Sequence, residues 1–253
     1  MKILGLLAAI LTGCMLLYCA GDFPDWGDPN SPASLHLSPH YIEKTVEETA
    51  VPNMVTSVLA DYRGFDTMFE TTVIFTAGVT VIILLRRFRR KEESDLPADT
   101  GSRRGPPDDI IIQTICRLMA PFMQLFALYV LCFGHHSPGG GFQGGVILGA
   151  SFILLGIAYD LKTMLRRMGT RVNALLANTG LLIYSGIGAL CVLLGANFLD
   201  YSILSLILPA TGRIMARSHG ILGVEIGVFL GVTTIMISIY LDLSSHGQLD
   251  EGL

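Results

Sequence analysis

Six runs of about 20 apolar residues constrain this chain more than any other feature of its sequence. Runs of this length match the hydrocarbon core of a bilayer, where backbone polar groups must be satisfied within their own segment, and this forces a helix. The chain is 51% hydrophobic and only 15% charged, which is typical of integral membrane proteins. We therefore predict an all-α membrane protein with about six transmembrane helices, near residues 3–20, 68–86, 110–133, 143–161, 173–195 and 219–241.

The basic residues predict the orientation in the membrane. Twelve of the 17 lysines and arginines lie at the start of the chain or after the second and fourth spans. The positive-inside rule makes that side cytoplasmic, so both termini are predicted to be cytoplasmic. Arg213 and Arg217, before the last span, fall on the opposite side. The motif LTGC at Leu11–Cys14 matches a lipoprotein signal, but the apolar run continues beyond it, so we expect an uncleaved first helix.

Residues 91–109 divide the chain into two predicted units. This stretch is charged, contains proline and glycine, and has no apolar periodicity, so we interpret it as a solvated cytoplasmic linker. It separates a two-helix unit at residues 1–90 from a four-helix unit at residues 110–253. In the first unit, the apolar residues between Ile42 and Tyr62 predict a short amphipathic helix at the outer surface of the membrane.

Ionisable residues inside the predicted spans are the main candidates for function, because hydrocarbon does not solvate them. Asp66 and Glu70 lie four residues apart, on one helix face at the outer start of the second span, and two acids this close suit a group that takes up and releases a proton or a cation. Glu225 in the last span points away from the glycine strip Gly223, Gly227 and Gly231, towards another helix or a polar cavity. Arg63 and Arg117 are possible charge partners of these acids. The alternative is that Asp66 pairs with Arg63 in the headgroup region and that Arg117 reaches towards the cytoplasm.

A glycine-rich stretch, GHHSPGGGFQGG at Gly134–Gly145, joins the third and fourth spans. Glycine allows backbone conformations that other residues avoid and lets another segment approach closely. We predict a re-entrant or tightly packed structural connection, with a flexible outer loop as the alternative. Its candidate residues are His135, His136, Pro138, Gly139, Gly140, Gly141, Gly144 and Gly145.

Several classes of function find no support in the sequence. The histidine pair lacks a nearby third ligand for a metal, and the five cysteines lie in apolar runs without metal-binding spacing. There is no P-loop, dinucleotide fingerprint or nucleophile constellation, and the basic clusters beside the spans do not resemble a nucleic-acid footprint. We expect no metal, no cofactor, no nucleic-acid partner and no enzymatic reaction carried out by this chain.

Two stretches resemble a known family. GHHSPGGGFQGGVILGASFILLGIAYD is similar to the signature of the B subunit of the Mrp multisubunit cation/proton antiporters. EETAVPNMVTSVLADYRGFDTMFETTVIFTA resembles the small unit that corresponds to the C-terminal part of the Mrp A subunit, with Phe69 where the family tends to have glycine. Both units also occur in membrane-bound hydrogenases related to respiratory complex I. The chain resembles a fusion of the two.

The resemblance implies a membrane subunit of an Na+/H+ antiporter in the prokaryotic cytoplasmic membrane. Its partners would be the other antiporter subunits, including large complex I-like proton-pumping subunits, together with membrane lipid, Na+ and H+. The resemblance assigns Glu70 to ion exchange, and His135, Pro138 and the glycines to the signature of the B subunit. The alternatives are an ion-translocating subunit of a membrane-bound hydrogenase or related oxidoreductase, and a structural scaffold that carries no ion.

Overall fold

The computed structural model describes residues 2–92, 110–208 and 212–245, and every regular element in these ranges is a helix. The predicted linker at residues 91–109 lies, apart from its first two residues, outside the described residues. The chain forms two compact units, one ending at Lys44 and the other beginning at Thr45.

All six predicted spans are present as helices that are long and apolar enough to cross a membrane, which confirms the predicted fold class. Helices α4 and α9 begin four to six residues earlier than predicted, at Gly64 and Arg213. Polar residues extend these helices, since backbone hydrogen bonds continue past the end of an apolar run. The six are α1 (Lys2–Ala20), α4 (Gly64–Glu92), α5 (Ile110–Cys132), α6 (Gly141–Ala158), α8 (Thr170–Leu193) and α9 (Arg213–Ser244).

The first unit contains α1, a π-helical turn at Ala33–Leu37 and the start of α2 (Ser38–Thr49). The large apolar side chains of α1, from Ile3 to Tyr18, are all exposed. A helix that is apolar all round and covered by no element of its own unit is suited to lipid or to another protein.

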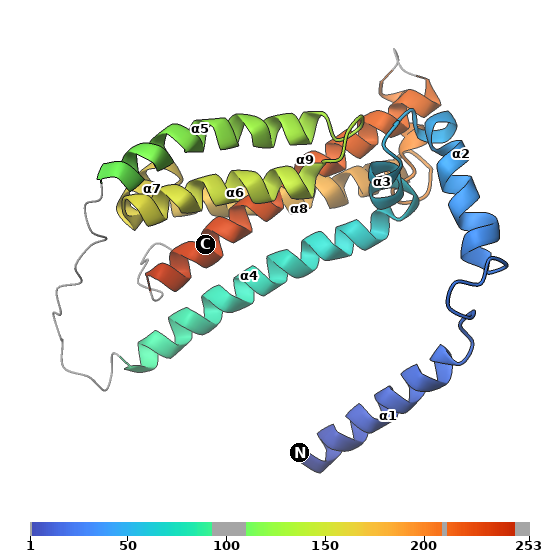
Figure 1. Cartoon of the computed structure of the whole chain (residues 1–253), viewed down its shortest axis with the longest axis horizontal. Coiled ribbons are helices and arrows are strands. Elements are labelled where there is room, and N and C mark those ends of the chain that lie inside the picture. Colours follow the sequence, from blue (N-terminus) through green and yellow to red (C-terminus); the bar gives the residue numbers. More distant parts are fainter. Residues whose placement is uncertain (1, 93–109, 209–211, 246–253) are drawn as a thin grey trace. The chain divides into compact units, whose positions relative to one another are not determined.

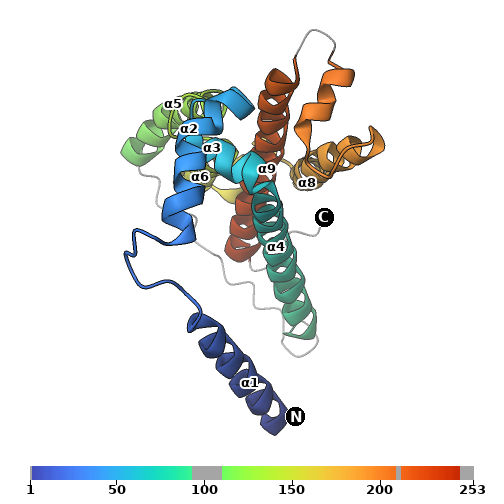
Figure 2. The ribbon, with the colours of Figure 1, turned by 90° about the vertical axis from the view of Figure 1, so that its right-hand side faces the viewer.

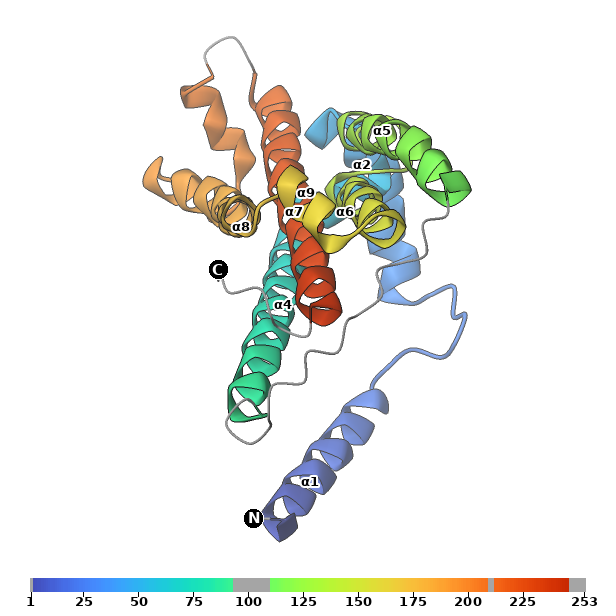
Figure 3. The same cartoon turned by 90° about the vertical axis from the view of Figure 1, so that its left-hand side faces the viewer.

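In the second unit, α9 is the central helix. It packs against α8 on one side and α6 on the other, and α4 lies along it as well, as Figures 1 and 3 show. α5 packs on α6, and the short helix α7 (Leu161–Arg167) connects α6 to α8. α9 is accordingly the most buried of the six spans.

The glycine strip of α9 is the reason that α8 comes so close. A Cβ placed on Gly180 of α8 would lie 2.6 Å from the carbonyl oxygen of Gly227 and 2.7 Å from the nitrogen of Gly231. The two backbones are therefore in direct contact, as in other membrane helix pairs built on small residues. This confirms that the strip is a packing surface.

The amphipathic helix predicted between Ile42 and Tyr62 is not continuous. α2 ends at Thr49, Ala50 takes a left-handed conformation with φ 55°, and Pro52 follows. Proline restricts the residue before it to extended backbone, which ends the helix. The chain then forms α3 (Met54–Ser57) and a π-helical turn at Val58–Tyr62 before α4 begins, and these two elements fold over the end of the bundle (Figure 2).

Two hydrogen bonds and one ion pair hold the chain between α3 and the start of α4 on the bundle. The Tyr184 hydroxyl of α8 donates to the carbonyl oxygen of Gly64 at 2.7 Å. The Tyr201 hydroxyl, from the 3-10 helix Tyr201–Leu206, donates to the carbonyl oxygen of Ala60 at 2.9 Å. Arg217 of α9 pairs with Asp61 at 2.8 Å, and the Asp61 side chain is only 7% exposed. Together these contacts set where α4 starts relative to α8 and α9.

We expect Gly180→Val to destabilise the bundle, because the new side chain must push α8 away from the backbone of α9. Overpacking of this kind costs on the order of 1–3 kcal/mol. The measurement is the thermal unfolding midpoint and membrane yield of the full-length chain. Gly186→Val on the same helix is the control, since a Cβ there meets nothing within 4 Å. Equal stability of the two variants would contradict the proposed packing.

Candidate functional site

The glycine-rich connection between α5 and α6 is shorter than the stretch that the sequence singled out. α5 ends at Cys132 and α6 begins at Gly141, so Gly141, Gly144 and Gly145 are helical rather than part of a loop. Gly140 has φ 127° and ψ −175°, a conformation open almost only to glycine. Its N–H donates to the carbonyl oxygen of Val130 at 3.2 Å, which folds the connection back onto α5.

The glycines of this region bring the start of α6 into backbone contact with both neighbours. A Cβ on Gly144 would lie 2.9 Å from the carbonyl oxygen of Ala127 in α5. Towards α9, a Cβ on Gly145 would lie 2.8 Å from the carbonyl oxygen of Phe229, and one on Gly141 would overlap the backbone of Glu225. The first turns of α6 are thus wedged between α5 and α9.

The segment before α4 is joined directly to this connection. The Asn53 side chain donates to the carbonyl oxygens of Gly134 at 2.7 Å and Ser137 at 2.8 Å, and its backbone N–H donates to the carbonyl oxygen of His135 at 2.9 Å. Thr56 donates a further hydrogen bond to Gly134 at 2.8 Å. The two stretches that stood out separately in the sequence therefore meet in one place.

Glu225 lies beneath the connection and is only 8% exposed. The backbone N–H of Gly141 lies near its carboxylate. His135 Nε2 lies 3.9 Å from Glu225 Oε2, and neither of these two buried atoms has a hydrogen-bond partner among the described residues. Glu225 is part of the lining of the cavity described next, and His135 lies beside its carboxylate without lining that cavity.

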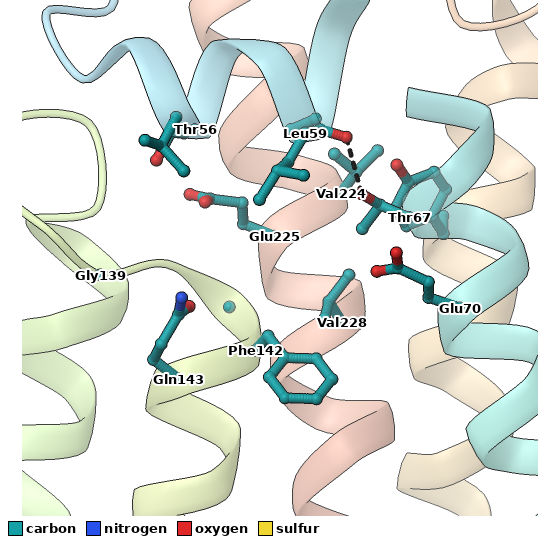
Figure 4. A pocket seen from close by; sticks show the side chains of 14 residues that line it. Thr56, Leu59, Thr67, Glu70, Gly139, Phe142, Gln143, Val224, Glu225 and Val228 are labelled. Carbon is teal, nitrogen blue, oxygen red and sulfur yellow. Dashed lines mark hydrogen bonds between the residues drawn. The ribbon is translucent and has the colours of Figure 1, made fainter. Parts of the chain in front are cut away.

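A cavity of about 330 Å³ opens beside Glu225, between α4, α6 and α9. Figure 4 shows Glu70 of α4 and Gln143 of α6 on opposite sides of it, with Thr56 above Glu225 and Thr67 close to Glu70. The hydroxyl of Thr67 donates to the carbonyl oxygen of Leu59 at 2.7 Å. The lining also includes Val55, Ala60, Gly139, Phe142, Tyr184, Val224 and Val228. Glu70 and Glu225 are the carboxylates of this lining.

The other candidate residues lie away from the cavity. Asp66 pairs with Arg63, with 2.6 Å between Arg63 Nε and the carboxylate, and both side chains are about half exposed. They line a second pocket with Asp61, Asp200 and Arg217, so Asp66 and Glu70 do not share one site. His136 and Pro138 are exposed on the connection. Arg117 is exposed on α5, and no ion pair joins it to a carboxylate within the part of the chain that is described.

Two features of the site were not predicted from the sequence. One is the pair Asp61–Arg217, because the sequence marks Arg217 only as a basic residue on the unexpected side of the membrane. The sequence signal that could have predicted this pair is charge, because Arg217 is positive and the segment before α4 is acidic. The other is the facing of His135 and Glu225, which lie 90 residues apart and share no sequence pattern.

Burial and charge act together on the imidazole of His135. Burial lowers the pKa of His135 below its usual range, and the nearby His136 and His219 lower it further. A neutral imidazole beside a buried carboxyl group can accept or donate a proton, and two carboxylates that line one cavity can bind a cation. In the described ranges, no group of three or more histidine, cysteine or acidic residues is placed to hold a metal ion.

Comparison with known proteins identifies the families that this chain matches. Residues 111–238 match the family described as a domain related to the MnhB subunit of Na+/H+ antiporters, and residues 25–100 match the MbhE family, described as the E subunit of MBH. The chain is 37% identical over 135 residues to the B subunit of the Na+/H+ antiporter of Bacillus subtilis, covering 52% of this chain and 90% of that protein. It is 28% identical over 220 residues to the A/B subunit of a probable K+/H+ antiporter of Rhizobium meliloti, where the match covers 79% of this chain but spans only 22% of the relative's length.

Two solved structures share the fold. The structure of the Mrp complex from a Dietzia species matches with a TM-score of 0.64 at 22% identity, covering 99% of this chain and 26% of that one. The archaeal membrane-bound sulfane sulfur reductase matches with a TM-score of 0.57 at 24% identity, covering 93% and 97%. The resemblance found in the sequence is confirmed: this multi-pass membrane protein belongs to the family of domains related to the MnhB subunit of Na+/H+ antiporters, and it carries an MbhE-like domain before that region.

Proposed function

We propose that this chain is a membrane subunit of a multisubunit monovalent cation/proton antiporter and that it contributes part of the ion path. The observation that carries the proposal is the cavity between α4, α6 and α9, with Glu70 on one side and Glu225 on the other. A carboxylate in a membrane span is costly unless water, a cation or a proton satisfies it. The relatives' names include both Na+ and K+, so Na+ is the first cation to test and K+ the second.

The exposed side of this cavity indicates that partner subunits cover it. Glu70 is exposed in the isolated chain, together with its neighbours Phe69 and Val73 on α4. Within the described residues α4 packs on α9 and α8 and leaves this face uncovered. Lipid cannot satisfy Glu70, so we propose that other antiporter subunits, including large proton-pumping subunits, close the cavity on this side.

The remaining expectations complete the proposal. The chain is a fusion of a unit at residues 1–90 and a unit at 110–253, joined by the linker at 91–109. It lies in the prokaryotic cytoplasmic membrane with both termini in the cytoplasm, because most basic residues are on that side. It carries out no bond chemistry of its own, needs no cofactor, and Asp66 sits at the outer approach to the path.

A second candidate is the equivalent ion-translocating subunit of a membrane-bound hydrogenase or related respiratory complex. The match of residues 25–100 to the MbhE family and the structural similarity to the sulfane sulfur reductase favour it. Purification of the intact complex distinguishes the two, since redox subunits with their cofactors would accompany the chain only in the second case. A purely structural role is the third possibility, and the following experiment tests it.

We expect Glu70→Gln and Glu225→Gln each to lower cation-dependent proton transport by about 100-fold or more, because each removes a group that exchanges a proton or cation. Transport is measured in everted membrane vesicles by the pH change that follows addition of Na+ or K+. Complex yield should be unchanged, since glutamine keeps the size and polarity of the side chain. Wild-type transport by both variants would leave only the scaffold role.

We expect Gly140→Val to impair assembly of the complex. A Cβ at Gly140 would lie 2.6 Å from Glu225 Oε1, and φ 127° would strain the backbone as well. Gly195→Val is the matched control, because Gly195 also has a positive φ of 93° but a Cβ there meets nothing within 4 Å. The measurement is the amount of intact complex after purification. Equal yields of the two variants would mean that backbone strain, and not the contact with Glu225, causes any loss.

A further inference from the structure

Two buried polar atoms face each other at the glycine-rich connection. His135 Nε2 and Glu225 Oε2 are 3.9 Å apart, and the side chains are 14% and 10% exposed. Neither atom has a hydrogen-bond partner among the residues that the structure describes. A buried polar group without a partner costs free energy, so such groups in native proteins call for an explanation. Here each atom is the nearest available partner of the other.

The polar atoms of His135 and Glu225 other than Nε2 and Oε2 also have neighbours, and these neighbours restrict how the two side chains can turn. His135 Nδ1 lies 3.4 Å from the hydroxyl oxygen of Ser218, and its carbonyl oxygen accepts from the N–H of Asn53. The Gly141 N–H lies near the Glu225 carboxylate, and a Cβ on Gly140 would lie 2.6 Å from its Oε1. His135 Nε2 and Glu225 Oε2 are left without a partner among the described residues, 3.9 Å apart.

We propose that His135 and Glu225 form a proton-binding site, in which Nε2 and Oε2 share one proton. In one state an imidazolium faces a carboxylate, and in the other a neutral imidazole faces a protonated carboxyl group. The two states contain the same atoms and the same total charge. A movement of about 1 Å brings Nε2 and Oε2 to hydrogen-bond distance, which is within the reach of a side-chain adjustment.

The chemistry of the pair selects a proton over an alkali cation. Hard cations are bound by oxygen ligands, whereas an imidazole nitrogen binds a proton strongly near neutral pH. On the Glu70 side of the cavity the polar groups are the carboxylate of Glu70 and the hydroxyl of Thr67, which are oxygen donors suited to Na+ or K+. The inference rests on the proposed function and deepens it: the Glu225 end handles the proton and the Glu70 end the cation.

The surroundings of the pair supply few competing charges. His136 on the connection and His219 on α9 are near enough to act on His135. The charges of Glu225 and Glu70 both act on the hydroxyl of Tyr184 in α8. The uncharged Gln143 of α6 lines the same cavity. The nearby cation Arg217 is held by Asp61. Ser218 then connects His135 to the end of the bundle at which α9 begins, the outer end in the proposed orientation.

The direct test is infrared difference spectroscopy of the purified complex in lipid nanodiscs, titrated with pH. We expect the C=O band of a protonated carboxylic acid that disappears in Glu225→Gln. In His135→Gln the midpoint of this band should move by about one pH unit or more, because its proton-sharing partner is gone. His136→Gln removes an exposed neighbour that acts on His135 only through its charge, so it should move the midpoint by less than His135→Gln does. Absence of the band in the wild type, or an unchanged midpoint in His135→Gln, would overturn the proposal.

A second variant tests the pair in case His135→Gln fails to fold. Ser218→Ala removes only the contact to Nδ1, so it should move the midpoint in the same direction by a smaller amount. In transport assays His135→Gln should lower the rate by about 10-fold or more and change its pH profile, while the cation concentration for half-maximal activity stays the same. An unchanged pH profile would count against the pair. If the wild-type complex moves no cation at all, the proposed function fails, yet the infrared titration still decides whether the pair binds a proton.

Discussion

The close approach of α6 to α9 is the contact on which the site depends. Gly141 and Gly145 let the backbone of α6 touch the backbone of α9 at Glu225 and Phe229. This contact brings the N–H of Gly141 near the Glu225 carboxylate and places Gly134 and Gly140 of the connection beside it. Any side chain on these glycines would separate the helices and open the carboxylate to lipid, which does not solvate it. The glycine run and the buried acid are therefore one structural unit.

The cavity is built jointly by the two family-matched regions of the chain. Glu70 and Thr67 come from the region that matches the MbhE family, whereas Glu225 and Gln143 come from the MnhB-related region. The hydrogen bonds of Asn53 and Thr56 to the connection, together with the pair Asp61–Arg217, hold the regions in register. Carrying both regions in one chain raises their effective concentration and ensures that they occur in equal number.

The two carboxylates of the cavity differ in their surroundings. Glu225 is enclosed by backbone and by His135, whereas Glu70 is exposed on the uncovered face of α4. A carboxylate that is nearly buried by its own chain is suited to a small, mobile proton. One at an open face is suited to an exchange that a neighbouring protein completes. The large exposed apolar area on α4 and α5 is consistent with a chain that functions inside a larger assembly.

The sequence by itself determined the number, type and approximate position of the membrane helices, because hydrocarbon permits only segments that satisfy their own backbone. It also determined the packing role of Gly223, Gly227 and Gly231, since helical periodicity places them on one face. Glu70 and Glu225 stood out as acids in apolar spans, and the family was recognisable from two short motifs.

Only the tertiary structure decided which of these residues meet. The break at Ala50 and Pro52, the pairing of Asp66 with Arg63 instead of Glu70, and the facing of His135 and Glu225 each depend on how helices are turned and where they cross. Periodicity along one helix shows which residues share a face of that helix, but it does not show which residues of another helix pack against that face. That packing is set by the fit of side chains and backbones from distant parts of the chain.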